Sequence, residues 1–247
     1  MTRPAAQHGA AARQGAAARQ DAAARQGAAS RPSAAATAAF IRANTTLGRP
    51  PLLPEIRIYL ARDAIELWER TEQQTGRAEL PPPFWAFPWA GGQALARYLL
   101  DHPDQVRGRT VLDFAAGSGL VAIAAARAGA AAVRAAETDP LAIAAITLNA
   151  GVNRVQLDAA LGDLLDGPAP EVDLLLAGDV FYERTFAKRL LPWLARTRAA
   201  GVEVLVGDPG RAYLPRDLGT EVGGYEVPVP RALEDADVKH STVWRLR

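Results

Sequence analysis

The stretch VLDFAAGSGLVAIAAA, residues 111–126, constrains the fold of this chain more than any other segment. An apolar strand ending near Asp113 runs into a turn in which Gly117 and Gly119 lack Cβ atoms, and a helix follows. Such a turn brings backbone N–H groups close to a nucleotide-like cofactor. Glu137 falls about twenty positions on, after a second apolar run. The alternative is that the glycines only turn the chain and bind no cofactor. Glu137 at this spacing disfavours that interpretation.

The glycine pattern separates two classes of cofactor. Dinucleotide folds usually carry G-x-G-x-x-G, whereas residues 115–120 read AAGSGL and lack the third glycine. The pattern D-x-x-x-G-x-G resembles motif I of the class I S-adenosylmethionine (SAM) methyltransferases. That resemblance implies an α/β fold with a Rossmann-like seven-stranded sheet, helices on both faces, and SAM as cofactor.

The same resemblance implies a role for each motif residue. Asp113 and the backbone around Gly117 and Gly119 would face the methionine moiety, and Glu137 would accept the ribose hydroxyls. Ala115 stands where these enzymes commonly have glycine. The methyl group of Ala115 slightly narrows the space through which the cofactor approaches the main chain. We expect this small residue to be tolerated there.

Strand and helix patterns alternate downstream, as a doubly wound sheet requires. Asp139 and Pro140 predict the N-cap and first residue of a helix. Apolar runs predict further strands at 155–161, 173–178 and 202–207, and an antiparallel pair at 225–229 and 241–247, which completes seven. Asp163, at the end of the third strand, suits the adenine amine.

An aromatic segment precedes the first cofactor strand. Phe84, Trp85, Phe87 and Trp89 crowd together in a chain with only 6% aromatic residues. They could form a hydrophobic lid over the sheet or a site wall that surrounds a sulfonium by cation–π contact. Both interpretations stay open here, and Trp89 is the residue we expect to touch the cofactor.

Composition excludes several kinds of site. A net charge of +1 gives no basic field, so nucleic acid is not expected as a partner. The chain has no cysteine and three scattered histidines, so we expect no metal. No uncharged apolar stretch reaches the ~20 residues of a membrane span. We expect a monomer.

The N-terminal region differs from the rest. GAAARQ at residues 9–14 recurs three times with decreasing fidelity, without a bulky apolar side chain. We therefore expect a disordered tail over 1–45, a strand, helix and aromatic lid segment over 46–105, and a SAM-binding core over 106–247. The tail also resembles a mitochondrial transit peptide; we favour a bacterial cytoplasmic protein, with the mitochondrial matrix as the alternative.

The segment LAGDVFYE at 176–183 carries the functional prediction. A lone Asp179 there would more often be a helix cap. The D-x-x-Y arrangement, however, resembles the seven-β-strand protein-lysine methyltransferases called family 16. PEIRI at 54, VLVGDPGR at 204 and STVW at 241 extend the resemblance over residues 53–247, specifically to members that act on the electron transfer flavoprotein β subunit.

This resemblance implies catalytic roles for Asp179 and Tyr182 and a cofactor contact at Gly178. A substrate lysine, with a reference pKa near 10.4, must lose a proton before it attacks SAM. Asp179 would draw it in, and Tyr182 would shape the channel. Glu183 and Asp208 are weaker candidates, with a helix turn and a strand-end cap as ordinary alternatives.

Other functions stay open. A methyltransferase for a ribosomal protein or a small amine would share the cofactor half of the sequence. A non-catalytic SAM-binding interaction module is the alternative from another class. Enzymes that methylate nucleic-acid amines typically carry D/N-P-P-Y/F after the fourth strand, where this chain has DVFY.

Overall fold

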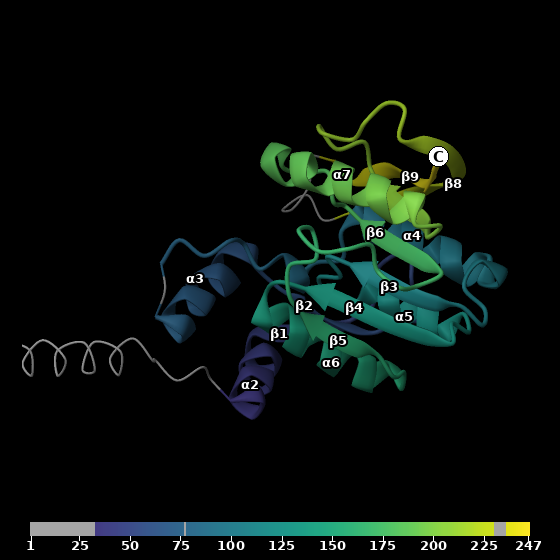
Figure 1. Cartoon of the computed structure of the whole chain (residues 1–247). Coiled ribbons are helices and arrows are strands. Elements are labelled where there is room, and N and C mark those ends of the chain that lie inside the picture. The colour runs from purple at the N-terminus through teal and green to yellow at the C-terminus, as the bar shows by residue number, and fades with distance from the viewer. Residues whose placement is uncertain (1–32, 77, 230–235) are drawn as a thin grey trace, which may run out of the picture. The chain divides into compact units, whose positions relative to one another are not determined.

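The computed structural model describes residues 33–76, 78–229 and 236–247, so the predicted repeat lies outside it. Figure 1 shows the elements. The α-helices are α2 (Ala34–Asn44), α3 (Ala64–Thr75), α4 (Ala90–Asp101), α5 (Leu120–Arg127), α6 (Pro140–Asn153) and α7 (Arg184–Ala199), with short 3₁₀ turns η1 (Phe84–Ala86) and η2 (Pro103–Gln105). The strands are β1 (Thr45–Gly48), β2 (Ile58–Ala61), β3 (Thr110–Phe114), β4 (Ala132–Glu137), β5 (Asp158–Leu161), β6 (Leu174–Gly178), β7 (Glu203–Asp208), β8 (Gly219–Pro228) and β9 (Val238–Leu246).

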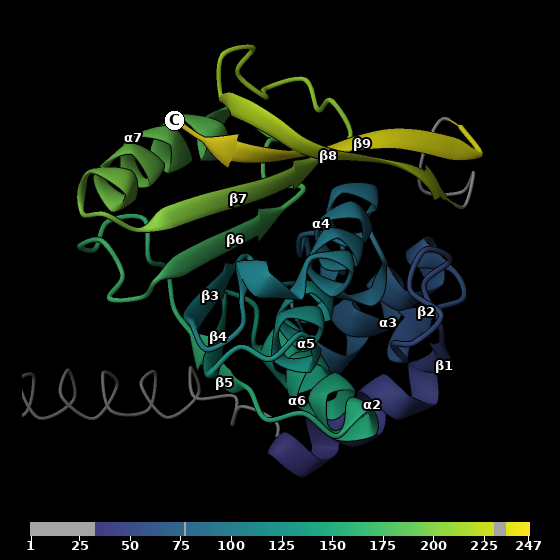
Figure 2. The same cartoon turned by 90° about the vertical axis from the view of Figure 1, so that its right-hand side faces the viewer.

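The main sheet lies within the compact unit Thr37–Arg247. Across the described residues its strand order is β5-β4-β3-β6-β7-β9-β8, with β3 to β7 parallel and β9 antiparallel to both neighbours. Figure 2 shows the twisted ladder with β8 and β9 at one edge. The predicted seven-stranded α/β fold is confirmed. Chain order reverses direction between β3 and β6, where parallel sheets bind ligands beyond the strands' carboxyl ends.

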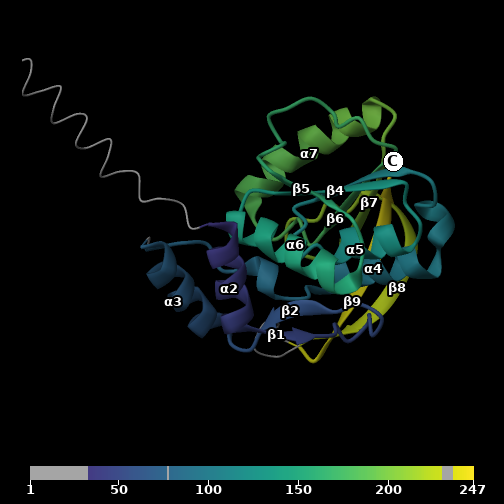
Figure 3. The same ribbon diagram turned by 90° about the horizontal axis from the view of Figure 1, so that it is seen from below.

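Alternate residues of the parallel strands serve two separate cores. Leu112 and Leu175 pack with Leu190 and Trp193 of α7 on one face. Leu174 and Leu176 join α4 and α5 on the other. Figure 3 shows the sheet between α7 and the group α4, α5 and α6. This double burial explains why the strands are continuous apolar runs.

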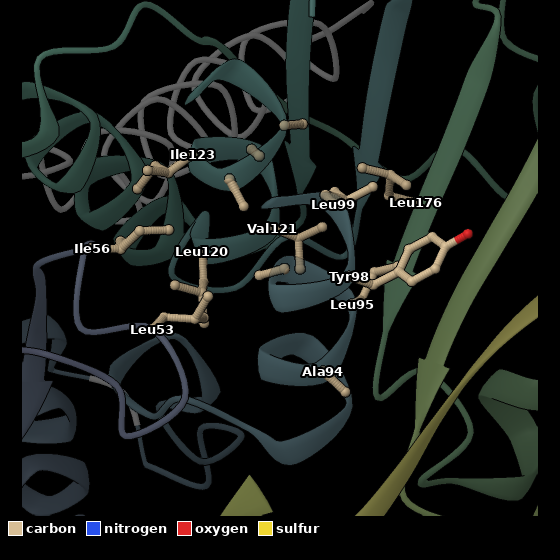
Figure 4. Close-up of a cluster of buried hydrophobic side chains, with 14 of the residues drawn as sticks. Leu53, Ile56, Ala94, Leu95, Tyr98, Leu99, Leu120, Val121, Ile123 and Leu176 are labelled. Atoms are coloured by element: carbon tan, nitrogen blue, oxygen red, sulfur yellow. The ribbon is translucent and has the colours of Figure 1, made fainter. Parts of the chain in front are cut away.

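The core on the α4 side is the larger. Figure 4 shows Leu95, Tyr98 and Leu99 of α4 close to Val121 of α5 and Leu176 of β6. Apart from Tyr98 and Val121, which are almost fully buried, these residues have no exposed surface. Leu95, Tyr98 and Leu99 lie three and four positions apart, so they share the face of α4 that packs on the sheet.

The N-terminal elements of this unit form a separate small sheet. β1 pairs antiparallel with β2. Asp63 is the N-cap of α3, and Gly76 ends this helix in a left-handed conformation. The expected tail boundary at residue 45 is wrong in one respect, because α2 covers Ala34–Asn44 and Ile41 is fully buried. Helix-compatible alanines and two large apolar side chains, Phe40 and Ile41, sufficed for ordered structure where we expected none.

No helix in the described parts of the chain is long and apolar enough to cross a membrane.

Candidate active site

A pocket of about 520 Å³ opens at the carboxyl ends of the parallel strands. Its walls come from 81–89, from 114–117 after β3, 136–139 after β4, 162–164 after β5, 178–182 after β6, from Phe186 and Arg189 of α7, and from Arg211 beyond β7. The predicted residues Trp89, Ala115, Gly117, Glu137, Asp163, Gly178, Asp179 and Tyr182 all line it. The parallel topology thus gathers side chains from distant parts of the sequence.

The turn after β3 adopts backbone angles suited to glycine. Gly117 and Gly119 have φ of 52° and 76°, and Ala115 has φ of 53°, a left-handed conformation that alanine rarely adopts. Gly119 lines neither this pocket nor a smaller cavity beside it. A Cβ there would come within 3.1 Å of Ile146, so this glycine allows α5 to approach α6. The structure thus gives Gly119 a packing role at a helix contact, while its neighbours Ser118 and Leu120 line the smaller cavity.

Glu137 closes the same turn from β4. Its Oε1 accepts the Gly117 N–H at 2.9 Å, and its Oε2 accepts the Thr138 N–H at 2.8 Å. Burial raises the pKa of this carboxyl above its usual value, against the opposing effect of these two bonds. The carboxylate is therefore already held at the pocket wall, at the position predicted to meet the ribose.

Asp113 lies deeper than predicted. Its side chain is 1% exposed, and Oδ2 accepts the Ala122 N–H at 2.9 Å. Burial raises its pKa to about 8. Asp113 lines a smaller cavity of about 50 Å³ that shares Trp89, Gly117 and Asp179 with the main pocket. It thus lies beside the large pocket and does not line it.

Asp163 follows β5, the strand at one edge of the sheet. Its Oδ1 accepts the Leu165 N–H at 3.0 Å, and Arg189 of α7 donates to its Oδ2 at 2.8 Å. The backbone bond and the guanidinium hold the pKa of this carboxyl below its usual range. A charged acceptor is thus present where the adenine amine was predicted.

The aromatic segment divides between core and pocket. Trp85 and Phe87 are buried in a cluster with Ile41 and Leu67, and Trp85 also lines the main pocket together with Phe84 and Trp89. Ring centroids of Phe84 and Trp89 are 6.0 Å apart, and those of Phe87 and Trp89 are 5.9 Å apart. Trp89 Nε1 donates to the Phe84 carbonyl at 2.9 Å. The segment therefore contributes both to a buried cluster and to the pocket wall, and Trp85 belongs to both.

Asp179 is held from two sides at the end of β6. Its Oδ2 accepts the Gly92 N–H at 2.7 Å, and its Oδ1 accepts Arg211 Nη2 at 2.9 Å. The side chain is 8% exposed, and φ is 55°. Gly92 lies in the first turn of α4, so Asp179 caps that helix across the fold. It nevertheless faces the pocket.

The residues after Asp179 have distinct environments. Tyr182 is half-exposed, and its ring centroid lies 5.4 Å from that of Phe84 and 5.8 Å from that of Phe186. Glu183 accepts the N–H groups of Thr185 and Phe186 as the N-cap of α7. Glu183 therefore lies in a helix turn, which was the alternative to a catalytic role.

Asp208 likewise serves as a strand-end cap. Its Oδ1 accepts the N–H groups of Gly210 and Arg211, both at 2.7 Å. Burial raises the pKa of Asp208 to about 6. The bonds shape the turn from which Arg211 extends into the pocket.

Three site residues escaped the sequence analysis: Gly92, Arg189 and Arg211. The sequence around Arg189 does not indicate a site residue, because its ion-pair partners Asp163 and Asp166 follow β5 whereas Arg189 lies in α7. Arg211 lies within the quoted motif VLVGDPGR, at the carboxyl end of a predicted strand. That position was a signal for Arg211, because all such ends converge at one sheet edge.

The residues present fit SAM. The pocket volume is within the range for a drug-sized ligand, and its lining is largely apolar with a few acidic groups. At Gly117 a Cβ would find no atom nearer than 3.9 Å, so the backbone is open to a ligand. Among the described residues no group of three His, Cys, Asp or Glu is placed to hold a metal ion.

Comparisons with known proteins find relatives of this chain. The family described as "Ribosomal protein L11 methyltransferase (PrmA)" matches residues 93–178. The electron transfer flavoprotein beta subunit lysine methyltransferase of Rattus norvegicus is 37% identical over 83% of this chain and 82% of its own length. The protein of the same name from Xenopus laevis is 41% identical over 83% and 85%. A solved RNA methyltransferase from Salinibacter ruber, in complex with S-adenosyl-L-homocysteine, is 18% identical, covers 62% of this chain and 90% of that one, and has a TM-score of 0.43.

Proposed function

This chain belongs to the family of electron transfer flavoprotein beta subunit lysine methyltransferases, and we propose that its substrate is a lysine of that flavoprotein subunit. It is a SAM-dependent protein-lysine N-methyltransferase. The observation that carries the substrate proposal is the similarity to these relatives over 83% of the chain. The pocket supports it, because the acidic groups and the aromatic wall meet at one edge of the sheet.

Binding of SAM would use both ends of the pocket. Glu137 would accept the ribose hydroxyls, Asp163 the adenine amine, and the backbone at Ala115, Gly117 and Gly178 would border the cofactor. Asp113 would reach the methionine end through the small cavity. Trp89 would lie against the positive sulfonium. Bound there, SAM supplies an electrophilic methyl group whose leaving group is a neutral thioether.

Asp179 and Tyr182 would handle the lysine. Asp179 has a charged carboxylate at the pocket wall, which would attract the ammonium and orient the amine once it has lost a proton. Tyr182, half-exposed between Phe84 and Phe186, would form one side of the channel through which the lysine side chain enters. Both roles rest on position, since both side chains line the pocket.

The remaining assignments follow the same proposal. The enzyme would act as a monomer on a protein, not on nucleic acid, with residues 106–247 as the SAM-binding core and 46–105 as the lid segment. It would work in a bacterial cytoplasm, or in the mitochondrial matrix if the N-terminal region is a transit peptide.

Transfer of labelled methyl groups tests the substrate. The purified chain is incubated with methyl-labelled SAM and, separately, with the flavoprotein β subunit, ribosomal protein L11 and total tRNA. We expect label on the β subunit alone, located on lysine by tandem mass spectrometry. Label on L11 but not on the β subunit would favour the ribosomal alternative. SAM binding without transfer to any protein in a lysate would favour a non-catalytic module.

A further inference from the structure

Asp179 already has a cationic partner in the pocket. Arg211 donates from Nη2 and Nε to Asp179 Oδ1 at 2.9 and 3.3 Å, and both side chains line the same wall. The other oxygen, Oδ2, accepts the Gly92 N–H at 2.7 Å. A substrate ammonium approaching Asp179 therefore meets a carboxylate–guanidinium pair in place of a lone negative charge.

Arg211 is held in this place from other directions as well. Its backbone N–H is bound by Asp208 Oδ1 at 2.7 Å, and its guanidinium carbon lies 5.7 Å from the ring centroid of Trp89. The side chain is only 20% exposed. An arginine fixed by an ion pair, a stacked ring and a capped main chain has little freedom to leave when the substrate enters.

The reaction makes this arrangement significant. A lone carboxylate beside a lysine stabilises the ammonium and so opposes loss of the proton that blocks the nitrogen lone pair. A guanidinium at hydrogen-bond distance from that carboxylate largely cancels its field, while Asp179 keeps oxygens that can accept an N–H of the neutral amine.

We propose that Arg211 stays paired with Asp179 in the enzyme–substrate complex and thereby favours the neutral, nucleophilic form of the substrate lysine. The inference rests on the proposed function and makes Arg211 a positioning residue of it. The lysine Nζ releases one proton to solvent, its lone pair forms the bond to the methyl carbon, and the electrons of the broken carbon–sulfur bond remain on sulfur. The product is a methylated ammonium beside a neutral pair.

Other titratable groups around the pair do not confuse this test. Those facing it or lining the same pocket are Asp208, Tyr182, Glu137, Asp139, Asp163 and Arg189. The α4 residues beside it, Ala90 to Gly92, carry no charge. The pKa of Asp208 is about 6, and burial raises that of Tyr182 above its usual value near 10. Asp113 lines the smaller cavity with Asp179, and burial raises its pKa to about 8, so it titrates between about pH 7 and about pH 9 as the lysine does. The test therefore reads the displacement of the pH profile between variants that all keep Asp113.

The test is the pH dependence of single-turnover methylation, with SAM-loaded enzyme in excess over the flavoprotein β subunit. Arg211→Gln and Arg211→Met remove the charge, Arg211→Lys keeps it, and Arg134→Gln removes a guanidinium from an exposed ion pair with Asp158. In the plot of methylation rate against pH, we expect the rising limb of both uncharged variants to shift by about one unit to higher pH. The rate near pH 7.5 should then be roughly tenfold slower. The rising limb should stay at the wild-type position in Arg211→Lys and Arg134→Gln. Calorimetric SAM affinity and melting temperature identify any variant that is merely misfolded.

Several outcomes would overturn the inference. If the uncharged variants bind the β subunit more tightly and the limb does not move, Arg211 is a cation that the lysine displaces. If neither uncharged variant folds, Arg211 is a structural residue only. Active wild-type enzyme with unshifted variants refutes the role of Arg211 alone, whereas wild-type enzyme without activity on the β subunit refutes the proposed function and this inference with it.

Discussion

The main chains of Gly91 and Gly207 are so close that a Cβ on Gly207 would overlap the carbonyl oxygen of Gly91. This contact lays the first turn of α4 on the end of β7. A second close approach, between Gly178 and Gly92, does the same for β6. As a result the Gly92 N–H reaches Asp179, so these glycines position the predicted catalytic carboxylate.

Gly207→Ala should therefore destabilise the fold. We expect the free energy of unfolding to fall by roughly 3 kcal/mol, because backbone and not a flexible side chain opposes the new methyl group. Gly92→Ala is the matched control, since its Cβ would lie 3.9 Å from its nearest neighbours and should change stability by less than about 1 kcal/mol. Urea denaturation measures both; equal losses would contradict the contact.

Glu137→Ala should weaken SAM binding at least tenfold. A carboxylate bridging both ribose hydroxyls contributes roughly 1.5–3 kcal/mol through charge-assisted hydrogen bonds. Asp158→Ala, which removes an exposed carboxylate paired with Arg134, should leave the affinity unchanged. Isothermal calorimetry gives both values and should detect no binding of NAD. Unaltered affinity in Glu137→Ala would refute the ribose assignment.

Asp113 predicts a pH-dependent difference in stability. Its pKa is raised to about 8 in the fold, so from about pH 4 to 8 the folded chain keeps a proton that the unfolded chain has released. Stability from this group falls by roughly 1.4 kcal/mol per pH unit over that window and no further above it. The melting temperature of Asp113→Asn relative to wild type should accordingly rise from pH 4 to 8 and then level off. A difference that stays constant over this pH range would contradict a protonated Asp113 in the fold.

Asp179→Asn should abolish methylation and spare SAM binding. The amide keeps an oxygen for the Gly92 N–H, so α4 retains its cap, but an NH₂ group replaces the oxygen that pairs with Arg211 and that would accept an N–H of the lysine. Labelled-methyl transfer and calorimetry are measured on the same preparation. Normal turnover, or a loss of SAM affinity in step with activity, would reduce Asp179 to a cap or a cofactor ligand.

Glu183→Ala should change stability and not catalysis. Loss of the N-cap of α7 is expected to cost about 1 kcal/mol in thermal or urea unfolding. Turnover at saturating substrate should match wild type at a temperature where both are folded. A large fall in turnover of the folded variant would return Glu183 to the candidate catalytic residues.

Local patterns predicted much of this fold. The strand, glycine turn and helix around Gly117, and the cap at Asp139, depend on neighbours a few residues away, and the structure confirms these elements. β1 was missed because TTLG is too short to show a period, and α2 because only Ile41 among its residues is buried.

Long-range partners could not be predicted in the same way. Asp179 contacts Gly92, 87 positions away, and Arg211, 32 positions away. No spacing rule joins them, since the sheet topology alone brings the three together. The sequence analysis accordingly treated Asp179 as a lone carboxylate or as a cap of the segment that follows. The structure shows a cap of a different helix and an ion pair.

The left-handed backbone at Asp179 restricts what evolution or an engineer can put there. At φ of 55° a β-branched or bulky side chain is strained, whereas aspartate, asparagine and glycine fit. Two of these residues, aspartate and asparagine, have nearly the same shape and differ in charge and hydrogen bonding. A single nucleotide change, from an aspartate to an asparagine codon, is therefore expected to abolish methylation. The folded protein would still bind its cofactor and its protein substrate.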